Sequence, residues 1–322
     1  EGMQILNLKT GDITSVSGVK LFSYSPQTDQ LIYLIESGAE KNKLIIASLK
    51  NGKMQSVSDV NHFLLSPDGN RLAYSTFSDS KNALCLVDLK KPDLIKRLST
   101  SDTNTFSFLT WQKDGRSLAF CRSADHQINS LIYYLTENDK LYEFNPSQHS
   151  GFPDSSVIVS GAFSKIIISD DLQKVFFSVK PQKNPSEKIK HSGVEVWNTQ
   201  DKWTYLQEQK NGDFKNKPKA ALWRPQSDRF DLITTHELPD IILSGDMEHA
   251  FLSNPKTHEP QFEYNAPRDF YILDLKTFKK SMLLEKHPFA SMLLNASPKG
   301  NYFAYFKENN WWIYNIVQNT HT

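Results

Sequence analysis

The stretch Ser66-Pro67-Asp68-Gly69-Asn70-Arg71-Leu72-Ala73-Tyr74-Ser75, followed by Ala83-Leu84-Cys85-Leu86-Val87-Asp88-Leu89, decides the fold of this chain. Its first part predicts a tight turn, because proline presets φ and Asp-Gly supplies a short polar side chain and a residue that tolerates positive φ. The runs 72–74 and 84–87 are short, apolar and bounded by turn residues, which is typical of strands buried on both faces. The stretch therefore predicts a turn that leads into neighbouring strands of one sheet.

The same unit recurs along the chain, and its copies align on an aromatic residue that follows the turn. These aromatic residues are Tyr33, Tyr74, Phe120, Phe177, Phe251 and Tyr305. The turns upstream of them lie at 25–26, 66–69, 113–115, 169–171, 244–246 and 297–300. Successive aromatics are between 41 residues (Tyr33 to Tyr74) and 74 residues (Phe177 to Phe251) apart. The shorter spacings match the ~40–50 residues of one four-stranded propeller blade, and the longer ones match a blade with a loop insertion.

We therefore predict an all-β fold, namely a β-propeller of about six to seven four-stranded blades or a truncated seven- or eight-bladed propeller. A single propeller domain is expected to span residues 1–322. Its expected repeats are 1–19 (partial), 20–57, 58–99, 100–160, 161–234, 235–285 and 286–322 (partial). The segment 180–219 is rich in Lys, Asn and Pro at both ends, which predicts an exposed insertion within the fifth of these repeats.

The two ends of the chain do not together complete one blade. Residues 3–16 predict an inner and an outer strand, whereas the C-terminal repeat is expected to stop before its outer strand. In one interpretation, the strand near 12–16 completes the last blade and closes the ring. In the other, both ends are cuts through a longer propeller. We favour the second, because residues 3–8 would otherwise duplicate a strand of the C-terminal blade.

Composition excludes several classes of function. A formal net charge of +1 gives no electrostatic case for binding nucleic acid or an anionic membrane. No stretch of about 18 apolar residues is present to span a bilayer. The chain begins at Glu1 with neither an initiator Met nor a signal peptide, so we expect a processed chain or a piece of a longer one. Cys85 and Cys121 each lie in an apolar strand run, which predicts buried free thiols.

Motif searches predict no catalytic, cofactor-binding or metal-binding residues in this chain, and no cofactor. There is no Gly-x-Ser-x-Gly, no Cys-x-x-Cys and no phosphate-binding glycine loop. His236-Glu237 begins like a zinc-protease helix, but it lacks the second histidine and Pro239 would break the helix. The turn aspartates Asp68, Asp114 and Asp170 are expected to accept hydrogen bonds from their own turns rather than to act as catalytic carboxylates.

The stretch Val194-Glu195-Val196-Trp197-Asn198-Thr199-Gln200-Asp201-Lys202-Trp203 admits two interpretations. Two tryptophans, an Asp and nearby amides within an insertion could form a surface that binds a small molecule or a peptide. Alternatively, the valines and tryptophans pack as a blade strand and its crossing. We favour the packing interpretation.

The Ser-Pro-Asp-Gly-x-x-Leu-Ala-Tyr repeat, the Val-Glu-Val-Trp-Asn-x-x-Asp stretch and the closing Asn-Trp-Trp-Ile-Tyr-Asn-Ile resemble one particular family. They are similar to the N-terminal propeller of bacterial serine peptidases of the prolyl oligopeptidase family, on its dipeptidyl-peptidase-like side. The turn repeat is also shared by TolB-type propellers. In the family, the propeller covers a C-terminal α/β-hydrolase domain with a Ser-Asp-His triad and filters peptide substrates by size. No triad motif has a matching position here, and the consecutive Glu-Glu of dipeptidyl peptidases does not occur.

The resemblance implies a non-catalytic propeller that gates substrate access and docks a hydrolase domain absent from this chain. Its expected partners are that domain and, in the parent protein, a peptide substrate, and its expected location is periplasmic or extracytoplasmic. The alternative is a stand-alone TolB-like propeller that binds a protein or small ligand. A third possibility is a propeller enzyme with its site at the central channel, such as a lyase or glycosidase.

Overall fold

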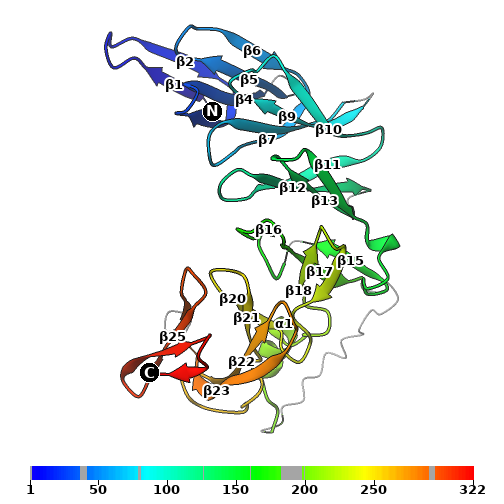
Figure 1. Cartoon of the computed structure of the whole chain (residues 1–322), viewed down its shortest axis with the longest axis vertical. Helices are drawn as coiled ribbons and strands as arrows, with labels where there is room; N and C mark the ends of the chain where they lie inside the picture. The colour runs from blue at the N-terminus through cyan, green and yellow to red at the C-terminus, as the bar shows by residue number, and fades with distance from the viewer. Residues whose placement is uncertain are drawn as a thin grey trace. The chain divides into compact units, whose positions relative to one another are not determined.

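The computed structural model describes residues 2–36, 42–78, 81–125, 127–159, 161–182, 198, 200–289 and 294–322. The chain divides into two compact units, Glu1–Gln148 and His149–Thr322 (Figure 1). The fold is all-β: apart from one short helix and one 3-10 turn, the regular structure of the described residues consists of strands. No helix in these parts of the chain has the length and apolar character needed to cross a membrane.

The first unit contains a two-stranded hairpin followed by three blades of four strands, and then a 3-10 turn, Pro146–Gln148. The hairpin is formed by β1 (Gly2–Leu6) and β2 (Ile13–Ser17). The blades are β3 (Val19–Ser25), β4 (Gln30–Glu36), β5 (Asn42–Ser48) and β6 (Met54–Val57); β7 (Val60–Leu65), β8 (Arg71–Thr76), β9 (Asn82–Asp88) and β10 (Ile95–Ser101); and β11 (Thr105–Trp111), β12 (Ser117–Ala124), β13 (Gln127–Leu135) and β14 (Lys140–Phe144).

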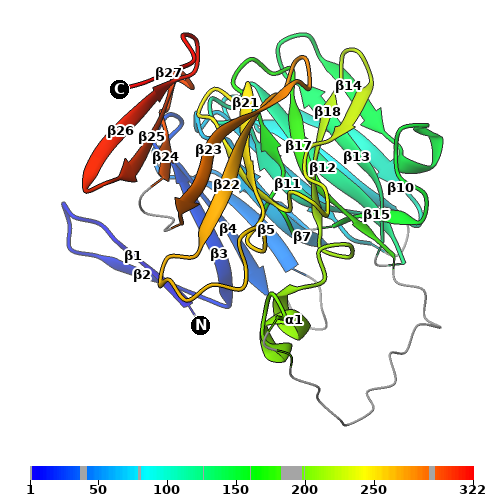
Figure 2. The ribbon, with the colours of Figure 1, turned by 90° about the horizontal axis from the view of Figure 1, so that it is seen from below.

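The second unit contains three further blades and the helix α1 (Tyr205–Asn211) (Figure 2). In its first blade the inner strand is made of two segments, which both pair with β17. The strands are β15 (Ser156–Val159), β16 (Ile167–Ile168), β17 (Val175–Pro181), β18 (Lys219–Arg224) and β19 (Arg229–Leu232); β20 (Asp240–Leu243), β21 (His249–Ser253), β22 (Pro267–Asp274) and β23 (Lys280–Pro288); and β24 (Leu294–Ala296), β25 (Tyr302–Lys307), β26 (Asn310–Asn315) and β27 (Thr320–His321).

The sheets β3–β6, β7–β10, β20–β23 and β24–β27 are four-stranded antiparallel meanders in which strands pair in chain order, which confirms the predicted propeller-type blades. In the second blade, Tyr74 of β8 lies opposite Phe63 of β7 and opposite Cys85 of β9. The central strands are buried on both faces, because neighbouring blades cover them. This explains why their sequences are continuous apolar runs rather than alternating ones.

The repeated turn has one hydrogen-bonding pattern. In the reference copy the Ser66 hydroxyl donates to Asp68 over 2.5 Å and accepts from the Arg71 backbone amide over 2.8 Å. The backbone amide of Asn70 also donates to Asp68, over 3.2 Å. The φ of Gly69 is 68°, in the left-handed region that glycine adopts without strain. The predicted turn chemistry is confirmed for this copy.

Two other copies follow the same pattern, one of them with a correction. Ser244 donates to Asp246 over 2.6 Å and accepts from the backbone amide of His249. In the blade that begins with β15, Ser169 donates to Asp171, so Asp171 and not Asp170 takes the position of Asp68. The sequence contains two adjacent aspartates there, and only the one two residues after the serine is in register with the other turns.

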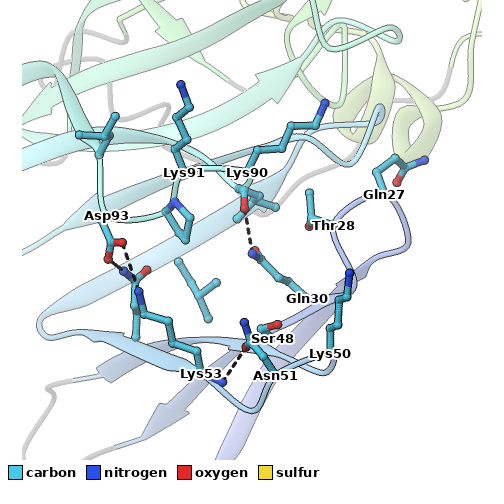
Figure 3. Close-up of a pocket in the computed structure, with 15 residues that line it drawn as sticks. Gln27, Thr28, Gln30, Ser48, Lys50, Asn51, Lys53, Lys90, Lys91 and Asp93 are labelled. Atoms are coloured by element: carbon cyan, nitrogen blue, oxygen red, sulfur yellow. Dashed lines mark hydrogen bonds and ion pairs between the residues drawn. The ribbon is translucent and has the colours of Figure 1, made fainter.

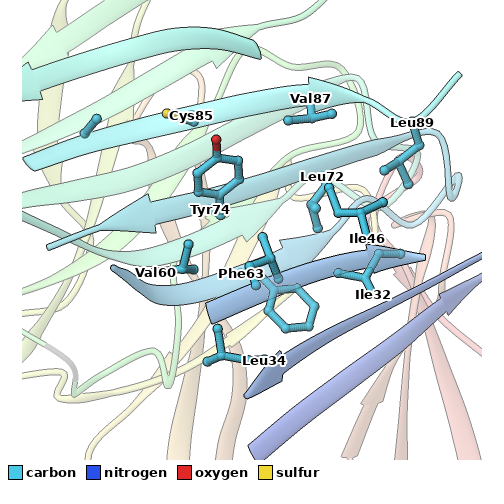
Figure 4. Packing of buried hydrophobic residues seen from close by; sticks show 12 residues of the cluster. Ile32, Leu34, Ile46, Val60, Phe63, Leu72, Tyr74, Cys85, Val87 and Leu89 are labelled. Carbon is cyan, nitrogen blue, oxygen red and sulfur yellow. The ribbon is translucent and has the colours of Figure 1, made fainter. Parts of the chain in front are cut away.

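The core of the first unit lies between adjacent blades. Figure 4 shows side chains of β4 and β5 packed against side chains of β7, β8 and β9. Phe63 (1% exposed) and Tyr74 (2% exposed) are the largest side chains of this cluster. Its other buried members are Ile32, Leu34, Leu44, Ile46, Val60, Leu72, Ala83, Cys85, Val87 and Leu89. Since this cluster draws side chains from both blades, each of the two blades stabilises the other.

The ends of the chain differ in part from expectation. Residues 2–17 form the predicted pair of strands, which makes a sheet of its own. The last blade, however, does not stop before its outer strand: Thr320 and His321 form β27 and pair with Asn315 and Tyr314. The sequence does not predict this strand, because two polar residues carry no apolar periodicity. The expected insertion 180–219 contains α1, none of whose residues is buried, while 183–197 and 199 lie outside the described residues.

Both cysteines are free and buried, as predicted. Burial raises the pKa of both thiols, that of Cys121 to about 12. Because the thiolate is the reactive form, we expect neither thiol to react with a disulfide reagent such as DTNB in the native chain at mildly alkaline pH. Both should react at once after denaturation. Rapid labelling of the native protein would contradict this placement of the two side chains.

Candidate functional site

A pocket of about 610 Å³ lies in the second unit, between the blade that begins with β15 and the blade β20–β23. Segments from several elements meet there: the connection between β15 and β16, the residues before β18, the start of β20, the start of β22 and the end of β23. Such a meeting of loops and strand ends on a rigid scaffold is where binding sites commonly form.

The wall of this pocket is mainly apolar. Phe251 and Phe270 belong to the core, and each is 1% exposed. Ile241 and Ile242 of the inner strand β20 also line it. The remaining apolar lining residues are Ala162, Pro218, Pro239 and Phe289. The pocket can therefore take up an apolar group and bury it from water.

Three charged residues of the pocket form a chain of ion pairs. Asp240 accepts from Lys217 over 2.7 Å through one carboxylate oxygen and from Arg268 over 2.8 Å through the other. Two cations and one anion leave one excess positive charge among the lining residues. The pocket thus combines an apolar wall with a local positive charge.

Arg268 is held rigidly. Its guanidinium lies 3.9 Å from the centre of the Phe289 ring, and its side chain is only 15% exposed. Burial lowers the pKa of Arg268, although Asp240 and Glu259 act to raise it; because a guanidinium is not deprotonated in proteins, the group stays charged. Among the described residues its buried Nε atom has no hydrogen-bond partner. A buried donor without a partner costs free energy, which an acceptor on a bound molecule would recover.

A smaller cleft of about 290 Å³ lies between the segment 198–207 and the loop 259–262. Trp203 packs edge-on against Phe214, with 5.7 Å between the ring centres. The Lys256 ammonium lies 4.7 Å from the Trp203 ring centre. Thr204 caps α1, where its side chain and that of Gln207 form a capping box. The aromatic ring of Phe262 is fully exposed at the edge of this cleft.

This cleft bears on the two interpretations of the stretch 194–203. Residues 194–197 and 199 lie outside the described residues, so the expected strand there stays a prediction. Trp203 packs against Phe214, and it does so outside the blade strands. It lies in the connection before α1, together with Asp201 and Lys202 at the cleft.

His236, Glu237 and the turn aspartates do not line these two pockets. His236 and Glu237 lie in an irregular connection between β19 and β20 rather than in a helix. In the described parts of the chain, no three His, Cys, Asp or Glu side chains group together as metal ligands would. His258 does pair with Asp269 over 2.7 Å. Burial acts to raise the pKa of Asp269, but hydrogen bonds from the Lys286 amide and His258 outweigh burial and lower it.

Comparison with known proteins yields fold similarities only. No protein-family model matches the sequence, and a search of curated proteins finds no match. Among solved structures, the chain is similar to the β-propeller domain of the trilobed protease from Pyrococcus furiosus, with 14% identity, a TM-score of 0.42, and coverage of 94% of this chain and 82% of that one.

Two further solved structures are also similar to the chain. For dipeptidyl peptidase 4 of Porphyromonas gingivalis the identity is 13%, the TM-score is 0.48, and 94% of this chain matches 46% of that one. For TolB of Acinetobacter baumannii the identity is 13%, the TM-score is 0.35, and 89% of this chain matches 60% of that one. The chain thus spans less than half of the dipeptidyl peptidase. The strand pairing of the chain itself, rather than these similarities, establishes its propeller-type blades.

Proposed function

We propose that this chain is a non-catalytic propeller domain of a prolyl-oligopeptidase-like serine peptidase, which gates peptide access and docks a hydrolase domain outside this chain. The resemblance of its repeat to that family supports a peptidase of this family as the parent protein. The pocket around Arg268 supports a role in binding peptides, and it is the observation that carries the proposal. In this role the pocket holds a peptide by an apolar side chain and a carboxylate.

The chemistry of the pocket selects such a ligand. Burying one aromatic or aliphatic side chain against its apolar wall contributes about 1.5–3 kcal/mol. A carboxylate balances the excess positive charge and accepts from the guanidinium, whose planar donor array matches a carboxylate. A peptide that ends in an apolar residue offers both groups close together. A ligand with only one of them would lose the other contribution.

The first test compares a short acetylated peptide that ends in phenylalanine with the same peptide as its C-terminal amide. We expect the acid to bind with at least about tenfold higher affinity by isothermal titration, because a hydrogen bond to a charged group contributes about 1.5–3 kcal/mol. Arg268→Gln should remove this preference. Arg229→Gln is the matched control, since Arg229 lies in the same unit but not in the pocket.

A second variant separates binding from a merely structural role. Asp240→Asn removes the carboxylate that competes for Arg268 and Lys217, so it should strengthen binding of the acid while leaving the amide unchanged. Equal affinity for acid and amide in the unmodified chain would refute this role of the pocket. So would equal losses in the Arg268 and Arg229 variants.

A further inference from the structure

A second pocket lies in the first unit, apart from the peptide pocket proposed above. It has a volume of about 680 Å³ and lies between the blades β3–β6 and β7–β10. The turns that follow β3, β5 and β9 surround it. Figure 3 shows Lys90 and Lys91 on one side, Lys50 and Lys53 on the other, and Gln30 between them. We call this pocket the lysine groove.

The lysine groove concentrates positive charge. Asp93 is the single carboxylate among its described lining residues, and it already pairs with Lys53 over 3.2 Å and accepts from Gln55. In the parts of the chain that the structure describes, the ammonium groups of Lys50, Lys90 and Lys91 form no ion pair. Four lysines and one aspartate give the groove a net charge of +3. Since the whole chain carries only +1, this is a local excess rather than a general property of the surface.

The groove also offers apolar surface and amide groups. Ile46, Leu89, Pro92 and Leu94 contribute aliphatic surface, and the side chain of Leu94 is 66% exposed. Gln30 is buried, donates to the Leu89 carbonyl over 2.8 Å, and has no described partner for its Oε1 atom. The Leu89 carbonyl fixes the orientation of this amide, so Oε1 is an acceptor left without a donor. The ligand should therefore be more than a simple anion.

Two observations favour carboxylates over phosphate. Several backbone amides of the turns are used within the turns themselves: those of Gly52 and Lys91 donate to the carbonyls of Ser48 and Asp88. These amides are therefore not available to hold a phosphate group. In addition, no arginine is among the described lining residues, so the groove lacks a planar donor array. Separate, flexible ammonium groups suit several carboxylates carried on flexible side chains.

We propose that the lysine groove binds an acidic peptide segment, whose carboxylates pair with Lys50, Lys90 and Lys91 and whose aliphatic side chains contact Leu89 and Leu94. The peptide backbone supplies the amide donors and acceptors that the glutamines of the groove require. This inference rests on residues 27–94 alone and does not depend on the peptide pocket of the second unit.

Fluorescence anisotropy with a labelled peptide rich in glutamate and leucine tests this assignment on the full chain. We expect saturable binding that weakens as salt is added, because exposed charges are screened beyond about 8 Å at physiological ionic strength. The triple variant Lys50→Gln, Lys90→Gln, Lys91→Gln should weaken binding about tenfold, since each exposed ion pair contributes about 0.2–1 kcal/mol. The matched control, Lys9→Gln, Lys43→Gln, Lys81→Gln, makes the same charge change outside the groove.

The outcomes separate the possible ligands. Binding that is lost in the groove variant and kept in the control supports the proposal. Absence of binding to the acidic peptide overturns it, as do equal losses in the two triple variants. Tripolyphosphate that binds more tightly than the peptide would assign the groove to phosphates instead. Sedimentation with anionic phosphatidylglycerol vesicles, without binding of the free peptide, would assign it to a lipid surface.

Discussion

Replacing Phe63 with alanine is expected to destabilise the first unit by about 3–5 kcal/mol, the usual cost of removing a buried phenylalanine ring. The Phe63 side chain is 1% exposed and packs between the blades β3–β6 and β7–β10. Its loss would leave a cavity at the contact between the two blades, where rigid strands on both sides limit relaxation. Each blade would then lose part of the surface that it buries against the other.

Urea denaturation followed by tryptophan fluorescence and circular dichroism would measure this effect. Because the chain divides into two compact units, the loss should appear in the transition of the first unit. Phe22→Ala is the matched control: the Phe22 side chain lies on β3 of the same unit and is 60% exposed. We expect the control to change stability by less than about 0.5 kcal/mol. Similar losses in both variants would contradict a core located between the blades.

Replacing Gly245 with alanine is expected to destabilise the second unit by about 3 kcal/mol, at the upper end of the cost of overpacking. Gly245 lies in the turn between β20 and β21, against the turn between β24 and β25. A Cβ atom there would lie 2.3 Å from the Pro298 carbonyl oxygen and 2.4 Å from that of Ser297. These are backbone atoms, so the neighbouring turn would have to move as a whole.

The control for this variant is Gly52→Ala. The φ of Gly52 is +70°, and no atom lies within 4 Å of the added Cβ, so only backbone strain of about 1–2 kcal/mol is expected. Thermal and urea denaturation of both variants would measure their free energies of unfolding. The comparison would distinguish the cost of backbone strain from the cost of a steric clash. If the two substitutions lower the free energy of unfolding equally, the turn at Gly245 is not in close contact with the turn of the neighbouring blade.

The turn repeat predicted the blades because each residue of it has a local physical role. Ser66, Asp68 and Gly69 form hydrogen bonds and a backbone conformation that depend only on residues within the turn. The same holds for Ser244 and Asp246. Local chemistry of this kind is visible in sequence, and so are the continuous apolar runs of the central strands.

The sites could not be predicted in the same way. Asp240 and Arg268 are 28 residues apart, and only the pairing of β20, β21 and β22 brings them together. Phe289 reaches Arg268 from the end of another strand, β23. The lysine groove similarly joins the turn 50–53 to the turn 90–94, which belong to different blades. In the sequence, only the adjacent residues Lys90 and Lys91 point to the lysine groove. Charged turns are common on any protein surface, so this pair alone does not predict a binding site.

One measurement tests the proposed function most directly. An antibody raised against this chain would be used to isolate the native protein from its source cells, and a fluorescent fluorophosphonate that labels active-site serines would be added. We predict a labelled band well above 36.9 kDa, because the propeller would be joined to a hydrolase domain. An unlabelled band near 36.9 kDa would contradict the peptidase assignment and indicate a stand-alone propeller that binds a protein or small ligand.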